Sequence, residues 1–513
     1  MDLNTSILAG SLVLLVGVAA VRVSTRIGLP SLLLYLVIGL VLGESGLGFG
    51  FEDAELTMIL GTIALAMILA EGGFSTRWDV IRPVVGLSGL LATAGVAISV
   101  AITATIAYWA LEVDVRTALL LGAVVGSTDA AATFAIMRRL PLAPRIRATL
   151  EAESGFNDPP VIILVSVVAS DAWHQASGWQ ILGLVVFQLV GGVLIGVGVA
   201  FLGQRILASS ALPAVGLYPL ATLAIMFLAF AVAGLLGVSG LMAIYVAGMW
   251  LGNAKLPHRQ ATAGFADGLG WVAQIGLFVL LGLLASPTRL PDALLPAAIV
   301  GIGLTLVARP ISVVACAIWW RVPWRHQMFL SWAGLRGAVP IVVATIPVSE
   351  GLPAAHRVFD IVFVLVITFV LIQAPLLPRL ARWSGLMVER ADELAVESAP
   401  LEKLGASVLQ FEVPQGSRLH GVFVDDLRLS EHVVLAFVAR EGGVVAAGPH
   451  LSLRHGDHLL LAVPDAVRDA TEGRLQAISR GGRLAVWNSP LSSEPYPPSR
   501  SRPATVPTSR AAR

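Results

Sequence analysis

Uninterrupted apolar runs of about 20 residues recur from near the N-terminus to about residue 380, and each is long enough to cross a bilayer as a helix. Only 13% of the 513 residues are charged, whereas 56% are hydrophobic. A soluble globule of this size needs a denser charged surface, so the sequence predicts an all-α polytopic membrane protein. The net charge of +1 is spread without a basic cluster, which gives no indication of nucleic-acid binding.

Charges and Gly/Pro turns between the apolar runs divide the chain into about thirteen membrane spans. The weakest division separates the eighth and ninth spans, because only residues 234–239 mark a turn there. The first run lacks preceding basic residues, so we interpret it as a span and not as a cleaved signal peptide. The predicted spans are residues 5–21, 29–43, 56–72, 83–110, 117–137, 156–170, 179–203, 213–233, 237–252, 266–285, 294–319, 328–348 and 358–378.

The basic residues test this division because they gather in alternate loops. Under the positive-inside rule the loops rich in arginine and lysine face the cytoplasm. We therefore expect a multi-pass protein of the bacterial plasma (inner) membrane with its N-terminus outside and its C-terminus in the cytoplasm. The residues that carry the pattern are Arg22, Arg26, Arg77, Arg82, Arg138, Arg139, Arg145, Arg147, Arg205, Lys255, Arg259, Arg321, Arg325, Arg379 and Arg382.

The composition changes after residue 385, which ends the predicted membrane domain (1–385). Residues 386–400 form a charged linker. Residues 401–476 predict a small α+β cytoplasmic domain, in which the alternating stretches 408–413 and 433–438 indicate strands. Residues 477–513 are predicted to be a disordered tail, because the tail is rich in Ser, Pro and Arg.

Ionisable side chains inside membrane spans are costly and mark functional candidates. Five stand out here: Glu71, Asp129, Glu153, Asp158 and Arg336. Each could instead be a loop residue that the span boundaries misplace. That alternative is strongest for Glu71, which stands next to two glycines, and weakest for Asp129, which is twelve residues into its span.

The segment 126–129 places a glycine and three polar side chains in mid-membrane, where they compete for backbone hydrogen bonds. Such a segment tends to unwind, and unwound backbone is tolerated only where it lines a cavity. The freed carbonyls can coordinate a cation. The sequence therefore predicts a broken helix and an ion site around Asp129.

A second polar segment, 153–160, opens the sixth span. If it is helical, Ser154 and Asp158 share one face, and Glu153 and Asn157 share the adjacent face. Pro159 disfavours the helical conformation at Asp158, so the helix could instead begin there with Asn157 or Asp158 as its N-cap.

Acidic side chains in a membrane helix need a counter-charge, and Arg336 is our first choice to pair with Glu153. Arg336 lies in the glycine- and proline-interrupted segment 334–340. The alternative is an arginine that extends to the interface. Arg309 is a similar residue without an evident partner. Asp267 and Asp360 are interpreted as span-boundary residues, and the histidines receive no role.

Together, the segments 127–129, 153–159 and 334–337 resemble the cation:proton antiporter family 1, and most of all its bacterial NhaP-type members. This resemblance covers residues 5–380. It implies a homodimer of thirteen-helix protomers with inverted repeats and two crossed, broken helices, for which spans five and twelve are the candidates. Residues 401–476 resemble the TrkA C-terminal (RCK-C) regulatory domain, which leaves room for a small-molecule or nucleotide ligand.

The resemblance also implies roles for individual residues. Asp158 corresponds to the carboxylate that binds either a monovalent cation or a proton, and Asn157 before it marks the electroneutral branch. Glu153 and Arg336 correspond to a structural ion pair, and Glu71 to an acidic residue near the site. Further ligands of the monovalent cation would be Asp129, Thr128 and Ser154.

The expected activity is therefore one-for-one exchange of a monovalent cation for H⁺ in cation and pH homeostasis, with K⁺ favoured and Na⁺ as the alternative. We expect no enzymatic activity and no cofactor. NAD binding in particular is not expected, since the chain lacks a GxGxxG nucleotide-binding motif. Two alternatives remain at this point. One is a cation channel regulated by an RCK-C domain, although no Thr-Val-Gly-Tyr-Gly filter occurs. The other is a sensor derived from a transporter.

Overall fold

The computed structural model describes residues 3–27, 30–43, 46, 48, 53–128, 142–171, 173, 177–210, 212–387, 406–430, 432–440, 443–482 and 485. The chain forms two compact units, Met1–Ala391 and Asp392–Arg513. In its described residues the first is helical apart from an isolated β-bridge between Leu142 and Met387, and the second contains a four-stranded sheet. The predicted fold class, a polytopic helical membrane protein with a small α+β C-terminal domain, is confirmed.

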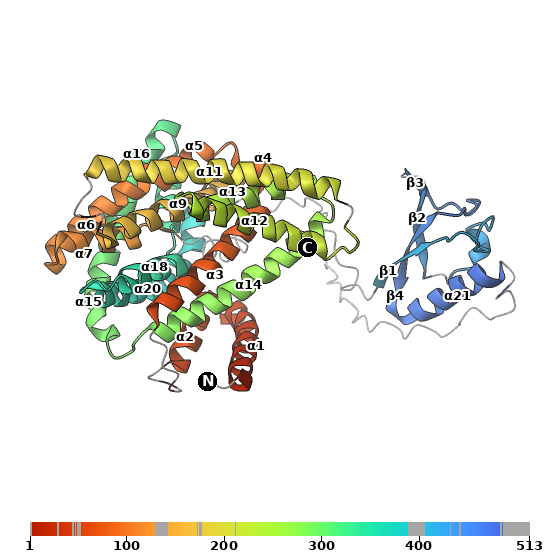
Figure 1. Cartoon of the computed structure of the whole chain (residues 1–513), viewed down its shortest axis with the longest axis horizontal. Coiled ribbons are helices and arrows are strands. Elements are labelled where there is room, and N and C mark those ends of the chain that lie inside the picture. The colour runs from red at the N-terminus through yellow and green to blue at the C-terminus, as the bar shows by residue number, and fades with distance from the viewer. Residues whose placement is uncertain are drawn as a thin grey trace, which may run out of the picture. The chain divides into compact units, whose positions relative to one another are not determined.

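Within the first unit, one set of helices packs mainly among its own members, and we call it the first group. Figure 1 shows α3 beside α14, and α11 running along α13. Glycines permit the closest approaches: a Cβ added to Gly252 of α13 would lie 2.0 Å from the backbone oxygen of Phe74 on α3. Small residues commonly bring membrane helices together in this way. The group consists of α1 (Leu3–Ile27), α2 (Ser31–Leu42), α3 (Ala54–Ser75), α11 (Gly178–Ser209), α12 (Leu217–Leu235), α13 (Gly240–Asn253) and α14 (Arg259–Leu284).

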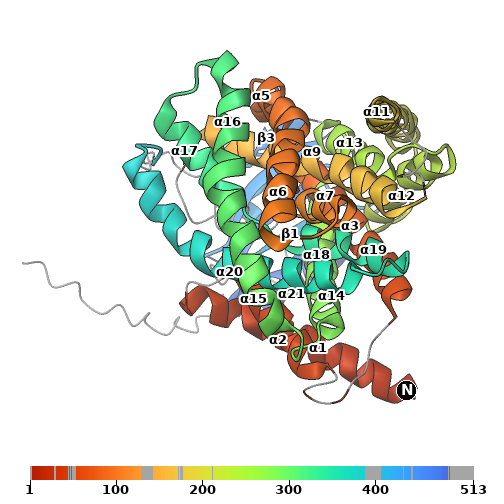
Figure 2. The same cartoon turned by 90° about the vertical axis from the view of Figure 1, so that its left-hand side faces the viewer.

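The second group of helices contains the polar segments singled out above. Figure 2 shows α6 and α7 close together near α16, and the contacts place α7 against α9. Its first part is α4 (Trp78–Ile81), α5 (Val85–Leu90), the π-helical segment η1 (Leu91–Gly95), α6 (Val96–Leu111), α7 (Val115–Val124) and α9 (Pro144–Ala169). Its second part is α15 (Leu290–Gly303), η2 (Leu304–Ala308), α16 (Arg309–Ala317), η3 (Ile318–Trp320), α17 (Trp324–Ala333), α18 (Ala338–Val343), α19 (Thr345–Ser349) and α20 (Ala355–Trp383).

Eight segments in the described part of the chain are long and apolar enough to cross a membrane, or nine if the bent pair Trp324–Ala333 and Ala338–Ser349 counts as one span. Three shorter apolar helices, α2, α7 and α13, add to these. All thirteen predicted spans overlap a helix, but the count of thirteen membrane crossings itself stays a prediction.

Helix α9 differs most from its predicted span. It begins at Pro144 and not near residue 156, and it continues through Pro159 and Pro160 without ending. Its first turns carry charged side chains, among them an exposed ion pair between Arg147 and Glu151 at 2.8 Å, and these charges hid the helix from an apolar search. At the other end, Arg116 donates hydrogen bonds to the carbonyls of residues 168–170, which satisfies the unpaired acceptors of the last turn.

The second unit contains an antiparallel sheet in the order β1-β4-β2-β3. Strands β1 and β2 overlap the two predicted strands. The helix α21 ends at Gly481, five residues beyond the boundary that the sequence suggested at 476. Leu461 of β4 and Ile478 of α21 belong to the core of this unit and are fully buried. The elements are β1 (Ala406–Glu412), η5 (Asp425–Leu427), β2 (Val434–Arg440), β3 (Gly443–Ala446), β4 (His458–Pro464), η6 (Asp465–Val467) and α21 (Arg468–Gly481).

Candidate functional site

Helical structure ends within the fifth predicted span, at the polar segment that its sequence marks. Helix α7 ends at Val124, and the chain continues through Gly126, Ser127 and Thr128 without helical structure. Ser127 and Thr128 are at most 1% exposed. Asp129, the candidate at the centre of this segment, lies outside the described residues, as do residues 130–141.

The twelfth predicted span is interrupted. Helix α17 ends at Ala333 and α18 begins at Ala338, and the helices on either side of this break differ in direction by 50°. Arg336 lies in the break and is 1% exposed. Its Nη1 donates hydrogen bonds to the carbonyl oxygens of Gly126 at 3.2 Å and Ser127 at 2.6 Å. The non-helical residues after α7 and the break between α17 and α18 therefore meet in space, and one guanidinium group joins them.

Helix α9 supplies the polar side chains that face the non-helical residues after α7. The Ser154 and Thr128 hydroxyls lie 3.1 Å apart and share a hydrogen bond. The Asn157 Nδ2 donates to the Thr128 hydroxyl at 2.5 Å. Asp158 is the next residue of the same helix and is 1% exposed. Asn157 and Asp158 are thus buried in mid-helix, so the alternative that either one caps the start of the helix is wrong.

The ion pair of this site differs from the predicted one. Glu153 pairs with Arg309 of α16 through Nη2 at 2.5 Å, and both side chains are at most 3% exposed. Arg336, the predicted partner of Glu153, instead binds the carbonyls described above. Arg309 also passes against the second break, since a Cβ on Gly334 would lie 2.8 Å from its Nε.

This correction has a physical reason. Glu153 and Asn157 lie one turn apart on α9, but their partners come from two different parts of the chain, Arg309 of α16 and Thr128 after the end of α7, which sequence spacing does not reveal. The available signal was that Arg309, like Arg336, is an arginine inside an apolar run, and such residues are expected to pair. Two buried arginines therefore serve two tasks, because one neutralises Glu153 and the other holds the unwound backbone.

A close approach to α9 from the first group was not predicted. A Cβ on Gly155 would lie 2.5 Å from both the Cζ and the hydroxyl oxygen of Tyr245 on α13, so a larger residue there would have to displace the tyrosine ring. The Tyr245 ring also makes an edge-to-face contact with Phe156, with 5.7 Å between the ring centroids. The sequence alone does not indicate this contact, because a single tyrosine in an apolar run gives no sign of which helix it packs against.

Two further acidic candidates of the first unit have neighbours that the sequence did not indicate. Glu71 of α3 packs against α14, where a Cβ on Gly270 would lie 3.3 Å from its Cγ. Asp360 lies in the second turn of α20 and forms an ion pair with Arg289 at 2.9 Å. Asp360 is 5% exposed, so its charge is neutralised inside the protein and not by water alone.

A helix that ends at a buried polar segment and a second helix that is interrupted beside it, inside a bundle of apolar helices, define a polytopic membrane protein of the secondary-transporter class. The chain belongs to the sodium/hydrogen exchanger family, whose transmembrane model matches residues 11–383. A TrkA-C domain model matches residues 408–484.

Individual relatives agree with this assignment. The K(+)/H(+) antiporter NhaP of Alkalimonas amylolytica is 37% identical over 396 residues, which cover 76% of this chain and 68% of that protein. The K(+)/H(+) antiporter NhaP2 of Shewanella oneidensis is 36% identical over 413 residues, covering 79% and 71%. Among solved structures, the sodium proton antiporter MjNhaP1 of Methanocaldococcus jannaschii has the same fold, with a TM-score of 0.66 and 23% identity over 76% of this chain and all of that one.

Proposed function

We propose that this protein is a secondary antiporter that exchanges a monovalent cation for protons, one for one, with K⁺ favoured and Na⁺ as the alternative. Membership of the sodium/hydrogen exchanger family supports the exchange. The preference for K⁺ is supported by the names of the two bacterial relatives and by the TrkA-C domain that follows the membrane unit.

The observation that carries this proposal is the buried polar cluster of Thr128, Ser154 and Asn157 beside Asp158. Hard monovalent cations prefer oxygen ligands, and the cluster offers hydroxyl and carboxylate oxygens. The Gly126 and Ser127 carbonyls accept hydrogen bonds from Arg336, so we assign cation binding chiefly to side-chain oxygens. A carboxylate can hold either a cation or a proton, and this competition couples the two fluxes.

The charges of these segments favour one-for-one exchange. Asp129, Glu153 and Asp158 are acidic, whereas Arg309 and Arg336 are basic. The sum is one negative charge, which one cation or one proton brings to zero. When the site moves across the membrane with either a cation or a proton bound, it then carries no net charge. Moving a net charge against a membrane potential of 100 mV would cost about 2.3 kcal/mol per charge.

We further propose that the protein works as a homodimer in the bacterial inner membrane, with its C-terminal unit in the cytoplasm. The distribution of basic residues over alternate loops supports this orientation. Glu71 and Asp129 are assigned to the surroundings of the site on the motif resemblance.

Purified protein in proteoliposomes tests the proposal. An imposed pH gradient should drive uptake of K⁺, and Asp158→Asn should abolish it. Asp292→Asn is a matched control because Asp292 is an exposed carboxylate in the first turn of α15, and it should transport like the unmodified protein. Cation flux that persists after the pH gradient is dissipated would indicate a channel, and undiminished exchange by Asp158→Asn would refute the site.

A further inference from the structure

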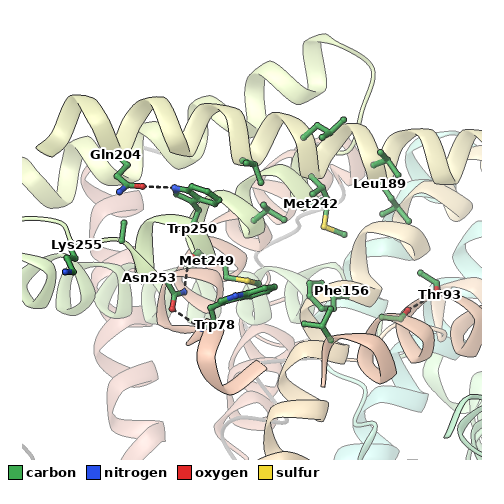
Figure 3. Close-up of a pocket in the computed structure, with 18 residues that line it drawn as sticks. Trp78, Thr93, Phe156, Leu189, Gln204, Met242, Met249, Trp250, Asn253 and Lys255 are labelled. Atoms are coloured by element: carbon green, nitrogen blue, oxygen red, sulfur yellow. Dashed lines mark hydrogen bonds between the residues drawn. The ribbon is translucent and has the colours of Figure 1, made fainter. Parts of the chain in front are cut away.

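A cavity of about 1020 Å³ lies between the two groups of helices, and no residue of the polar cluster lines it. Its walls come from α4, α5, η1 and Phe156 of α9 on one side, and from α11 and α13 with residues 254–255 on the other. Figure 3 shows the lining side chains arranged along α11 and α13. This volume is at the upper end of the range for ligand sites in proteins.

One end of the cavity is apolar. It is lined by Leu189, Val193, Met242 and Phe156. Figure 3 labels Leu189, Met242 and Phe156 toward its right-hand side. The one hydroxyl there, that of Thr93, already donates to the Gly89 carbonyl at 2.7 Å. A path for ions or water needs polar walls, so this end is suited to hydrocarbon.

The other end is polar and aromatic. Trp250 donates its indole N–H to Gln204 Oε1 at 2.8 Å. Asn253 accepts from the backbone N–H of Trp78 at 2.9 Å and donates to the Thr76 carbonyl at 2.8 Å. Tryptophans with polar neighbours are typical of the membrane interface. The cavity therefore changes from interfacial to apolar character along its length, as an amphiphile does.

Lys255 adds a positive charge at the polar end. It is exposed and lines the cavity, and it forms no ion pair with any residue that the structure describes. None of the lining residues is acidic. Arg205 lies next to Gln204 in the chain and stacks on Phe201, with 4.3 Å from its Cζ to the ring centroid. This end therefore favours an anionic group such as a phosphate.

The wall formed by α11 is open. Leu194 lines the cavity and is 66% exposed, and Val190 beside it is 53% exposed. A molecule with an acyl chain can enter sideways from the bilayer without passing through water. The occupant that fits an open apolar wall, interfacial tryptophans and an unpaired lysine is a membrane lipid.

We propose that this cavity binds one anionic glycerophospholipid. Its phosphate lies near Lys255 and the two tryptophans, and an acyl chain runs between α11 and α13 toward Phe156. Phe156 is two residues from Asp158 on α9, so the acyl chain contacts the helix that carries the polar cluster. The site itself does not depend on which ions the protein transports.

Native mass spectrometry of the purified full-length protein tests this with phosphatidylglycerol and phosphatidylethanolamine as probes. We expect one phosphatidylglycerol per protomer, held more tightly than phosphatidylethanolamine. Lys255→Gln should weaken phosphatidylglycerol binding about fivefold, the loss expected for one lysine near a lipid headgroup. Val246→Trp should abolish the binding of both lipids, because it fills the apolar end.

Two variants serve as matched controls. Arg259→Gln removes a nearby basic residue that does not line the cavity, and Leu295→Trp adds a bulky ring at a site on α15 that is 71% exposed. Both should keep full phosphatidylglycerol binding. If Val246→Trp fails to fold, Leu194→Trp blocks the open wall instead. Undiminished lipid binding in a folded cavity-filling variant would refute the site. If both lipids bind equally tightly and Lys255→Gln changes neither affinity, the proposed preference for an anionic headgroup is refuted.

Discussion

Arg336 donates a hydrogen bond of 2.6 Å to the carbonyl oxygen of Ser127, although 209 positions separate the two residues. The donor stands in the break between α17 and α18, and the acceptor follows the end of α7. Unwound backbone inside a membrane protein needs partners that replace the lost helical hydrogen bonds. The guanidinium supplies them for two successive carbonyls from a fully buried position, so each non-helical segment depends on the other.

Arg336→Gln should therefore lower both stability and transport. Hydrogen bonds to charged groups contribute about 1.5–3 kcal/mol each, and their loss should reduce the thermal midpoint in scanning fluorimetry and abolish exchange. Arg336→Lys keeps the positive charge but lacks the several N–H donors of the guanidinium group, so its stability and its exchange rate should be intermediate. Arg77→Gln is the control because the Arg77–Asp79 pair is exposed on both sides and contributes little. Normal stability of Arg336→Gln would contradict the linking role.

A double-mutant cycle should show that Glu153 is coupled to Arg309. Glu153→Leu leaves a buried arginine without its partner and should cost about 3–5 kcal/mol, whereas adding Arg309→Met should recover much of that loss. Thermal unfolding of the purified variants measures the coupling. A second cycle that combines Glu153→Leu with Arg336→Met should show a smaller coupling energy than the cycle with Arg309→Met. A larger coupling energy for Arg336 would instead support the Glu153–Arg336 pair that the sequence suggested.

Thr128→Val should weaken the apparent affinity for the transported cation about tenfold, because it removes an oxygen and leaves the Asn157 amide without its acceptor. The Km for K⁺ in proteoliposomes measures this change. Ser99→Ala is matched to it, since it removes one of two buried hydroxyls that bond at 3.0 Å between α6 and α16. The control should lose some stability but keep its Km. A similar rise in Km for both would show a general packing effect.

The sequence predicts most of the framework because membrane helices and strands have strong periodic signals. The break at 334–337 is predictable from its two glycines and from Pro340 shortly after it, and so is the polar character of 126–128. Pairing is different. Glu153 could face either Arg309 or Arg336, and only the packing of α16 against its neighbours decides which guanidinium reaches it.

The start of α9 shows another limit. The residue before a proline tends to leave the helical conformation, which suggested a helix start near Asp158. Within a membrane protein, neighbouring side chains can satisfy the carbonyls that a proline frees, and α9 continues through Pro159 and Pro160. Local preference is overridden there by burial among other helices.

Gly155→Ala should impair transport by forcing α9 and α13 apart. The added Cβ would meet the end of the Tyr245 ring, which is 3% exposed and has little room to move. Exchange rates in proteoliposomes should fall about tenfold, because overpacking of a buried contact typically costs about 1–3 kcal/mol. Tyr245→Leu should restore part of the rate in the Gly155→Ala background. Gly276→Ala is the control, because a Cβ on Gly276 meets nothing within 4 Å.

The C-terminal unit contains a carboxylate that should make its stability depend on pH. Asp457 is fully buried and accepts hydrogen bonds from the Arg440 Nε and Nη2 at 2.8 Å each and from the Arg454 backbone N–H at 2.7 Å. Burial alone would raise the pKa of Asp457, but the hydrogen bonds and the Arg440 charge outweigh it and hold the pKa below its usual value.

A lowered pKa means that the folded unit favours the ionised carboxylate more than the unfolded chain does. This stabilisation is fully present above the unfolded pKa of about 3.9 and is lost as the pH falls through the lower folded value. Hydrogen exchange of β2 and β4 in the full-length protein, corrected for intrinsic rates, should accelerate as the pH drops below about 4. Asp457→Asn should exchange faster than the unmodified protein at pH 7 and show a weaker dependence on pH. Equal pH dependence in both proteins would assign the effect to another group.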